Sequence, residues 1–312
     1  MRLLLLLILA AMSTASGQSF VVEKPAFRDL VPEGATVEKL VGGFKFLEGP
    51  AWNPVHGYLV FSDIPASKIY WYDVETRQAN GDNVFNAQGS GANGNFFDAA
   101  GTLYTCAHLA RCVLTKGEHS GVSPLVERYE GKRFNSPNDI VVKSDGTIWF
   151  TDPTYGLGKR EKEQATNNVY CFDPKTNGLH AVVTDFVQPN GLCFSPDEKK
   201  LYVADSGHPP QHVRVFDVTA DNTLANGRVF CEIDQGVPDG IRCDRHGNLF
   251  SSADDGVHVF APDGTRLGKI LVPEPPANLC FGGAAGDDLY ITARTSLYRI
   301  RLLTTGAGRG SL

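Results

Sequence analysis

The sequence predicts an all-β protein, a six-bladed β-propeller whose four-stranded blades surround a central channel. Three observations support this fold class. Six segments of similar pattern recur along the 312 residues, short apolar runs typical of strands lie between them, and no amphipathic helical window of useful length is found. Glycine accounts for 33 residues, about one in ten, against ~7% in average proteins. This composition favours many tight turns and therefore many short strands.

Each repeat consists of a polar residue, a short apolar strand, a turn rich in Asp, Gly and Asn, and a second strand. The six segments read EGPAWNPVHGYLVFSD, ANGNFFDAAGTLYTCAH, PNDIVVKSDGTIWFTDP, PNGLCFSPDEKKLYVADS, PDGIRCDRHGNLFSSADD and ANLCFGGAAGDDLYITAR. We call the polar residue of each segment a mouth residue; these are Glu48, Asn93, Asn138, Asn190, Asp239 and Asn278. Their successive spacings are 45, 45, 52, 49 and 39 residues. A period of ~40–50 residues with several strands per unit is typical of propellers.

Further strands are expected between the repeats, at residues 68–72, 168–172, 212–216 and 257–260. Each is followed by Asp or Pro, as hairpin connections require. Six units of about four strands account for nearly all of residues 38–303, which we take as one domain. We expect the first strand, around residues 40–46, to complete the last blade beside residues 297–303, because such closure removes exposed sheet edges.

The two ends of the chain lie outside this repeat. Residues 1–17 combine one positive charge, a nine-residue apolar run and small residues before Gly17, which predicts a signal peptide and export to the periplasm or medium. An uncleaved membrane anchor is the alternative, although the run is short for a span. Residues 18–37 are expected to lie across the first blade, and residues 304–312 to form a flexible tail.

Charge and cysteine content exclude two other classes of function. The net charge is -6 and no basic stripe is present, which argues against nucleic-acid binding. None of the seven cysteines forms a CxxC pair or shows zinc-ligand spacing. Most lie in apolar runs and are expected to be buried thiols. Only Cys106 and Cys112 are close enough in sequence to suggest a bridge.

Equivalent positions of a propeller repeat converge on the central channel, so the mouth residues are expected to lie together. All six offer carboxylate or amide oxygens, and an all-oxygen ring suits a hard cation such as calcium, magnesium or manganese. The alternative is that the Asn-Gly and Asp-Gly pairs are ordinary turn dipeptides. We favour the shared site because four such polar positions at propeller spacing and a Glu-Gly-Pro occur at one phase of the repeat.

The motifs EGPAW, RFNSPND, PNGL and PDG, in this order, resemble the gluconolactonase, regucalcin (senescence marker protein) and luciferin-regenerating enzyme family of six-bladed propellers. The resemblance covers residues 38–303, and FNSPNDIVVKSDGTIWFTDP is typical of the bacterial gluconolactonase-like branch. It implies four metal ligands, Glu48, Asn138, Asn190 and Asp239, with Asp239 also the catalytic carboxylate.

Further site residues follow from the same resemblance and from the ends of the second strands. Arg133 resembles a family residue that contacts substrate hydroxyls. Some members carry the ligand asparagine directly after Arg-Phe, where this chain has Asn135; we choose Asn138 for its phase and keep Asn135 as a substrate contact. His108 could shuttle a proton and Tyr155 could stack on a sugar ring, or both could be structural. Four aspartates at strand ends are turn caps or channel lining: Asp63, Asp152, Asp205 and Asp254.

Together these residues favour an exported, metal-dependent lactonase that opens a sugar lactone such as gluconolactone. One divalent cation, Ca²⁺ first with Zn²⁺, Mn²⁺ or Mg²⁺ open, would polarise the carbonyl. Asp239 would activate water as a general base or attack directly. The alternatives are hydrolysis of another lactone, ester or organophosphate at the same site, and a non-enzymatic propeller that binds a ligand or calcium.

Overall fold

The computed structural model describes residues 19–80, 90–207 and 209–308. The predicted signal peptide lies outside the described residues. Within them, no helix is long and apolar enough to cross a membrane.

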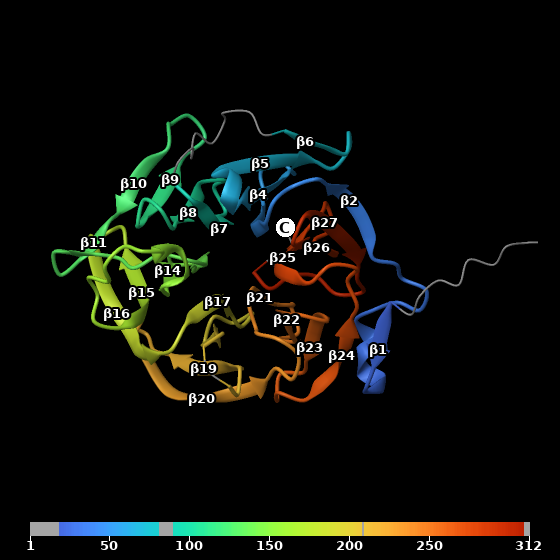
Figure 1. Cartoon of the computed structure of the whole chain (residues 1–312). Helices are drawn as coiled ribbons and strands as arrows, with labels where there is room; N and C mark the ends of the chain where they lie inside the picture. Colours follow the sequence, from blue (N-terminus) through green and yellow to red (C-terminus); the bar gives the residue numbers. More distant parts are fainter. Residues whose placement is uncertain (1–18, 81–89, 208, 309–312) are drawn as a thin grey trace, which may run out of the picture.

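Six antiparallel sheets form a ring around a central axis, as Figure 1 shows, so the predicted six-bladed propeller is confirmed. Blade 1 contains β3 (Leu47–Trp52), β4 (Leu59–Asp63), β5 (Lys68–Asp73) and β6 (Gln78–Asn80). Blade 2 contains β7 (Ala92–Phe97), β8 (Leu103–Ala107), β9 (Cys112–Lys116) and β10 (Ser123–Val126). Blade 3 contains β13 (Ile140–Val142), β14 (Ile148–Asp152), β15 (Asn167–Asp173) and β16 (Gly178–Phe186).

The remaining blades follow the same order from the inside outward. Blade 4 contains β17 (Pro189–Phe194), β18 (Lys200–Asp205), β19 (His212–Val218) and β20 (Leu224–Glu232). Blade 5 contains β21 (Ile241–Cys243), β22 (Leu249–Ala253), β23 (Gly256–Phe260) and β24 (Arg266–Ile270). Blade 6 contains β25 (Pro276–Gly282), β26 (Asp288–Ala293) and β27 (Ser296–Arg301). Besides β1 and β2, whose places are given below, the other described elements are the hairpin of β11 (Arg128–Tyr129) and β12 (Lys132–Arg133) and the 3-10 turns η1 (Pro25–Asp29), η2 (Ile64–Ala66) and η3 (Tyr155–Leu157).

The ring closes through its earliest propeller strand. β2 (Glu38–Gly42) pairs antiparallel with β27, with Lys39 opposite Tyr298, and so becomes the fourth strand of blade 6. The sequence predicts this closure, although the strand ends at Gly42 and not at residue 46. Closure leaves the first and last blades side by side, and the rings of Trp52 and Tyr290 stack across this junction at 5.7 Å.

Both ends of the described chain pack on blade 5, which corrects two expectations. Residues 19–37 do not cover the first blade: β1 (Phe20–Val22) pairs with β24 as a fifth strand, and Phe27 is fully buried against blades 5 and 6. The outer edge of β24 is thereby paired instead of exposed. The tail is ordered as far as residue 307, because Thr304 donates its hydroxyl to Asp244 and Ala307 bonds the carbonyl of Cys243.

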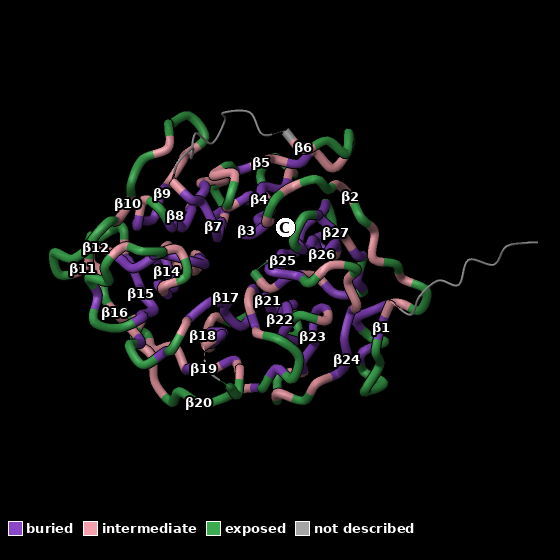
Figure 2. Tube along the Cα trace, in the orientation of Figure 1, coloured by how far each residue is buried: buried purple, intermediate pink, exposed green. Residues whose placement is uncertain are grey.

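Burial falls from the axis outward, as Figure 2 shows. The inner strands β17 and β25 are buried at every position, whereas the outer strand β20 is mostly half-buried or exposed. Apolar side chains of neighbouring blades pack against each other, for example Trp149 of blade 3 against Phe194 of blade 4. All seven cysteines are buried and free, so Cys106 and Cys112 are not bridged.

Candidate active site

The mouth residues all lie at the start of inner strands. Four of them belong to β3, β7, β17 and β25, and Asn138 and Asp239 each stand two positions before the first residue of β13 and β21. Figure 1 places the labelled strands β7, β17, β21 and β25 around the centre of the ring. The repeat therefore brings its polar residues to the inner wall of the propeller.

The glycine that follows a mouth residue lets neighbouring blades approach closely. A Cβ atom at Gly49 would lie 2.1 Å from the carbonyl oxygen of Asn93, and one at Gly191 would lie 2.2 Å from that of Asp239. The backbone N–H of Gly94 donates to the carbonyl of Asn138 over 2.8 Å in the same way. These pairs lie in or beside inner strands and not in hairpin turns, so the turn-dipeptide alternative is wrong for them.

Glu48 and Asp239 are two carboxyls whose pKa values are both raised. Glu48 is 3% exposed and accepts hydrogen bonds from the Gly49 N–H at 2.8 Å and the Asn278 amide at 3.0 Å. Burial, and then the charge of Asp139, raise its pKa to about 7. Burial and the charge of Glu48 raise the pKa of Asp239 well above its usual value. A cation placed between them would stabilise both ionised forms.

Tyr155 joins this group from the loop that follows β14. The residue is 48% exposed, and Ser206 and Asn190 lie close enough to its hydroxyl to affect its pKa. The Asn190 amide in turn donates to Ser206 Oγ at 3.1 Å. Burial of the hydroxyl end, with the charge of Asp239, raises the pKa of Tyr155 to about 12, so the phenol is neutral and can donate at pH 7. About half of the residue remains open to solvent, and its hydroxyl is near enough to Asp239 to sense its charge.

His108 pairs with the mouth residue Asn93. Its Nε2 lies 2.7 Å from the Asn93 amide nitrogen, and the imidazole is 6% exposed. Burial and then Arg160 lower the pKa of His108 to about 4, so the ring is neutral at pH 7. The Asn93 Oδ1 is buried and has no hydrogen-bond partner among the described residues. A neutral imidazole that positions Asn93 fits this geometry better than a proton shuttle.

Arg133 and Asn135 are held by other loops. The Arg133 guanidinium donates to the carbonyl of Ala110 at 3.3 Å, and its backbone N–H donates to Glu163 at 2.8 Å. Asn135 is fully buried, and its amide donates to three acceptors, the carbonyls of Asp152 and Thr166 and the side chain of Asn167. The described contacts of Asn135 therefore organise the loop before β13.

Three of the strand-end aspartates share one structural role. Each accepts two successive backbone N–H groups from the loop that leads into its own blade: Asp63 from residues 45 and 46, Asp152 from 135 and 136, and Asp205 from 187 and 188. Burial raises the pKa of Asp152 to about 7. Asp254 is exposed and does not share this arrangement.

Sequence reasoning missed Asp139 and Arg242. The Asp139 carboxylate is fully buried, and its Oδ2 accepts a hydrogen bond from Arg242 Nη1 at 3.3 Å. The signal was present, since each is a charged residue within an otherwise apolar inner-strand run, in PNDIVV and GIRC. Buried charges of this kind are normally paired, but the partner on another blade is not visible in sequence.

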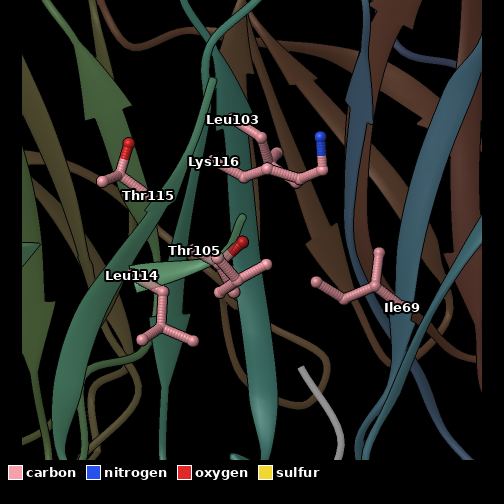
Figure 3. A pocket seen from close by; sticks show the side chains of 7 residues that line it. Ile69, Leu103, Thr105, Leu114, Thr115 and Lys116 are labelled. Atoms are coloured by element: carbon pink, nitrogen blue, oxygen red, sulfur yellow. The ribbon is translucent and has the colours of Figure 1, made fainter. Parts of the chain in front are cut away.

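The carboxylate and amide oxygens of the mouth residues fit a hard cation that is held by few carboxylates. No three His, Cys, Asp or Glu side chains form a metal-binding group among the residues that the structure describes. Binding would therefore require the amide oxygens of Asn138 and Asn190 beside Glu48 and Asp239, a mixture that suits calcium or magnesium. A separate pocket, shown in Figure 3, lies between blades 1 and 2 and has room for about one water molecule (≈ 10 Å³). No mouth residue lines it.

A family described as the SMP-30/Gluconolactonase/LRE-like region matches residues 46–295. The chain belongs to this family. A gluconolactonase from Zymomonas mobilis is 31% identical, and the match covers 90% of this chain and 85% of that one. A solved gluconolactonase from Xanthomonas campestris is 34% identical with a TM-score of 0.85, covering 91% of this chain and 95% of that one.

The family resemblance extends in structure to more distant members. A calcium-binding regucalcin from Agrobacterium tumefaciens is 18% identical with a TM-score of 0.71, covering 88% of this chain and 96% of that one. At this identity the likeness shows the shared propeller fold alone. The family expected from the EGP, PND, PNG and PDG motifs is thus confirmed.

Proposed function

We propose that the protein is a hydrolase that opens sugar lactones with the help of one divalent cation, foremost Ca²⁺. The observation that carries the proposal is the pair of Glu48, which is buried, and Asp239, which is half-buried, among the amide side chains that begin the inner strands; the pKa values of both carboxyls are raised. Membership of the family and the gluconolactonase relatives support the substrate class. The four residues that would hold the cation are Glu48, Asn138, Asn190 and Asp239.

The cation, when bound, would act as a Lewis acid on the lactone carbonyl. Asp239 is the better placed of the two carboxyls for chemistry, because it is half-buried whereas Glu48 is 3% exposed. As a general base, Asp239 would take a proton from water as the water oxygen attacks the carbonyl carbon. The ring C–O bond then breaks, the ring oxygen gains a proton, and an open hydroxy acid leaves.

The remaining residues would bind and orient the substrate. Tyr155 offers an open aromatic face beside Asn190, which suits stacking on a sugar ring. His108 would hold Asn93 in place, since its lowered pKa makes it a poor proton carrier at neutral pH. Contact of Arg133 and Asn135 with substrate hydroxyls stays a prediction from the family resemblance.

The test is the hydrolysis of glucono-δ-lactone, followed as acid release in a pH-stat. Metal-stripped protein is assayed alone and with added calcium, magnesium, manganese or zinc, and spontaneous opening is subtracted. We expect a cation to restore turnover, and Asp239→Asn to abolish it. Asp254→Asn is the matched control, because Asp254 is an exposed carboxylate of the same blade. Its activity should equal that of the wild type.

Absence of turnover with every cation would reject the sugar-lactone proposal. The same proteins would then be tested on other lactones, aryl esters and organophosphates. Binding of one calcium ion without turnover of any ester would favour a calcium-binding propeller, in which the ion is the ligand and not the cofactor.

A further inference from the structure

Arg242 is a buried cation that joins three blades beside the carboxyl pair. It lies in β21 of blade 5 and is 8% exposed. Its Nη1 donates to Asp139 Oδ2 of blade 3 at 3.3 Å, to the Leu192 carbonyl of blade 4 at 3.3 Å, and to the Ile241 carbonyl at 2.7 Å. Its Nη2 is buried without a hydrogen-bond partner among the described residues. The guanidinium is therefore fixed within the protein and shielded from solvent.

The charges around this guanidinium do not cancel. The negative charge of Asp139 raises the pKa of both Glu48 and Asp239. The positive charge of Arg242 lowers the pKa of Glu48. When all are ionised, three carboxylates and one guanidinium leave a net charge of about −2, which one divalent cation would neutralise. Arg294 also acts on Asp239, but its side chain is exposed and its charge is screened by water and salt.

Stability alone is a weak explanation for this ion pair. Removing two charges from water is costly, and an apolar pair of similar volume is often as stable or more so. The pair instead places one fixed positive charge against Asp139, the residue directly after the proposed ligand Asn138.

We propose that Arg242 is a built-in cation that sets the charge of the proposed ion site to about −2, so that the site selects divalent over trivalent ions. Arg242 is thus a positioning and selectivity residue that acts through Asp139, and not a catalytic residue. The inference rests on the proposed cation site at Glu48 and Asp239, but not on the identity of the substrate.

The test compares the affinity for Tb³⁺ with that for Ca²⁺ by calorimetric titration of metal-stripped protein. Four forms are used: wild type, Arg242→Met, Asp139→Asn, and the double variant. By charge count, Arg242→Met brings the site to −3, Asp139→Asn to −1, and the double variant back to −2. The ratio of the two affinities is the readout, because distortion of the site weakens both ions together.

We expect Arg242→Met to raise the Tb³⁺/Ca²⁺ affinity ratio by about tenfold or more, and Asp139→Asn to lower it by a similar factor, since one unit charge acts more strongly on a trivalent ion. The double variant should return to within about threefold of the wild type. Arg242→Lys keeps the charge and should also keep the ratio, which makes the test independent of whether Arg242→Met folds well.

Arg266→Met serves as the matched control, because Arg266 pairs with Glu23 and Asp234 on the outer strand of blade 5. A ratio that is the same in all forms would overturn the proposal and leave Arg242 as a structural link between blades. If wild-type protein bound neither ion, the cation site itself would be rejected and this inference with it. Binding of both ions without lactone hydrolysis would reject only the proposed reaction.

Discussion

Gly191 of blade 4 donates its backbone N–H to the carbonyl oxygen of Asp239 of blade 5 over 3.0 Å, and a Cβ atom on Gly191 would lie 2.2 Å from that oxygen. The backbone of the proposed catalytic residue is therefore placed by direct contact with the neighbouring blade. A side chain at residue 191 could fit only if the two blades moved apart, which would displace Asp239.

We expect Gly191→Ala to lower both stability and activity. Overpacking of this kind costs about 1–3 kcal/mol, and a displacement of ~1 Å at a catalytic group can reduce the rate by about a hundredfold. Chemical unfolding and the lactone assay measure the two effects. Gly121→Ala is the control, since a Cβ atom there meets nothing within 4 Å. Wild-type activity in Gly191→Ala would show that blade contact does not position Asp239.

Stabilisation by calcium should depend steeply on pH. In the cation-free protein, the raised pKa of Glu48 (about 7) means that folding favours its protonated form. This contribution to stability is present below the ordinary pKa of a glutamate and is lost as the pH rises through about 7. At pH 8 the Glu48 carboxylate is ionised and lacks a counter-charge, whereas at pH 5 calcium must displace its proton.

The expected result is a larger calcium-induced rise in melting temperature at pH 8 than at pH 5. The apparent affinity should gain up to about tenfold per pH unit for each proton displaced. Glu48→Gln should remove most of the difference. An equal rise at both pH values would contradict binding at this carboxyl pair.

His108 should make the protein less stable in acid. Its pKa is lowered to about 4 in the folded state, so the unfolded chain binds more protons between pH 6.5 and 4. The stability from the neutral ring is complete above pH 6.5 and is lost as the pH falls towards 4, by about 3 kcal/mol. His108→Gln should therefore lose less stability than the wild type between pH 7 and 4 in urea unfolding. His119→Gln, at a side chain that is 90% exposed, should behave like the wild type.

Tyr155 should contribute to substrate binding through its ring and its hydroxyl. Tyr155→Phe removes the hydroxyl, and the loss of one hydrogen bond of about 1 kcal/mol to the substrate should reduce kcat/KM by about fivefold. Tyr155→Ala also removes the stacking surface and should mainly raise KM, by about tenfold or more. Val229→Ala, at an exposed apolar side chain of β20, is the control. An unchanged KM in Tyr155→Ala would exclude the ring from the binding site.

Export remains a prediction of residues 1–17. Expression of the full chain in a bacterial host, followed by fractionation and N-terminal sequencing, should find a mature protein in the periplasm or medium that begins at Gln18. A cytoplasmic product that retains Met1, or an intact chain in the membrane fraction, would contradict cleavage after Gly17.

The propeller and its mouth residues are readable from the sequence because the repeat is local. Each unit carries its own strand, turn and polar residue at a spacing of 39–52 residues, and the symmetry of the fold then places equivalent residues together. The strand that closes the ring is predictable for the same reason, as blade 6 would otherwise lack a strand.

Contacts between blades determine the strand partners and side-chain contacts that local sequence patterns do not define. Residues 19–37 add to blade 5 because the outer edge of β24 would otherwise be unpaired. Nothing in their own sequence pattern indicates that β24 is the strand they pair with. Asn135 appears in sequence beside Arg133, yet in space its amide is used by the loops around Asp152. The glycines of PNG and PDG read as turn residues, whereas close approach of the next blade is what requires glycine.

By itself, then, the sequence determined the fold class, the family motifs and the ring of oxygen donors, since all three follow from short segments that repeat. Only the tertiary structure decided which charges meet. Asp139 and Arg242 stand 103 residues apart and on different blades, and their contact at 3.3 Å exists because ring closure brings blades 3 and 5 to a common axis. The same closure buries Glu48 beside Asp239, and burial, which no local pattern encodes, is what raises both pKa values.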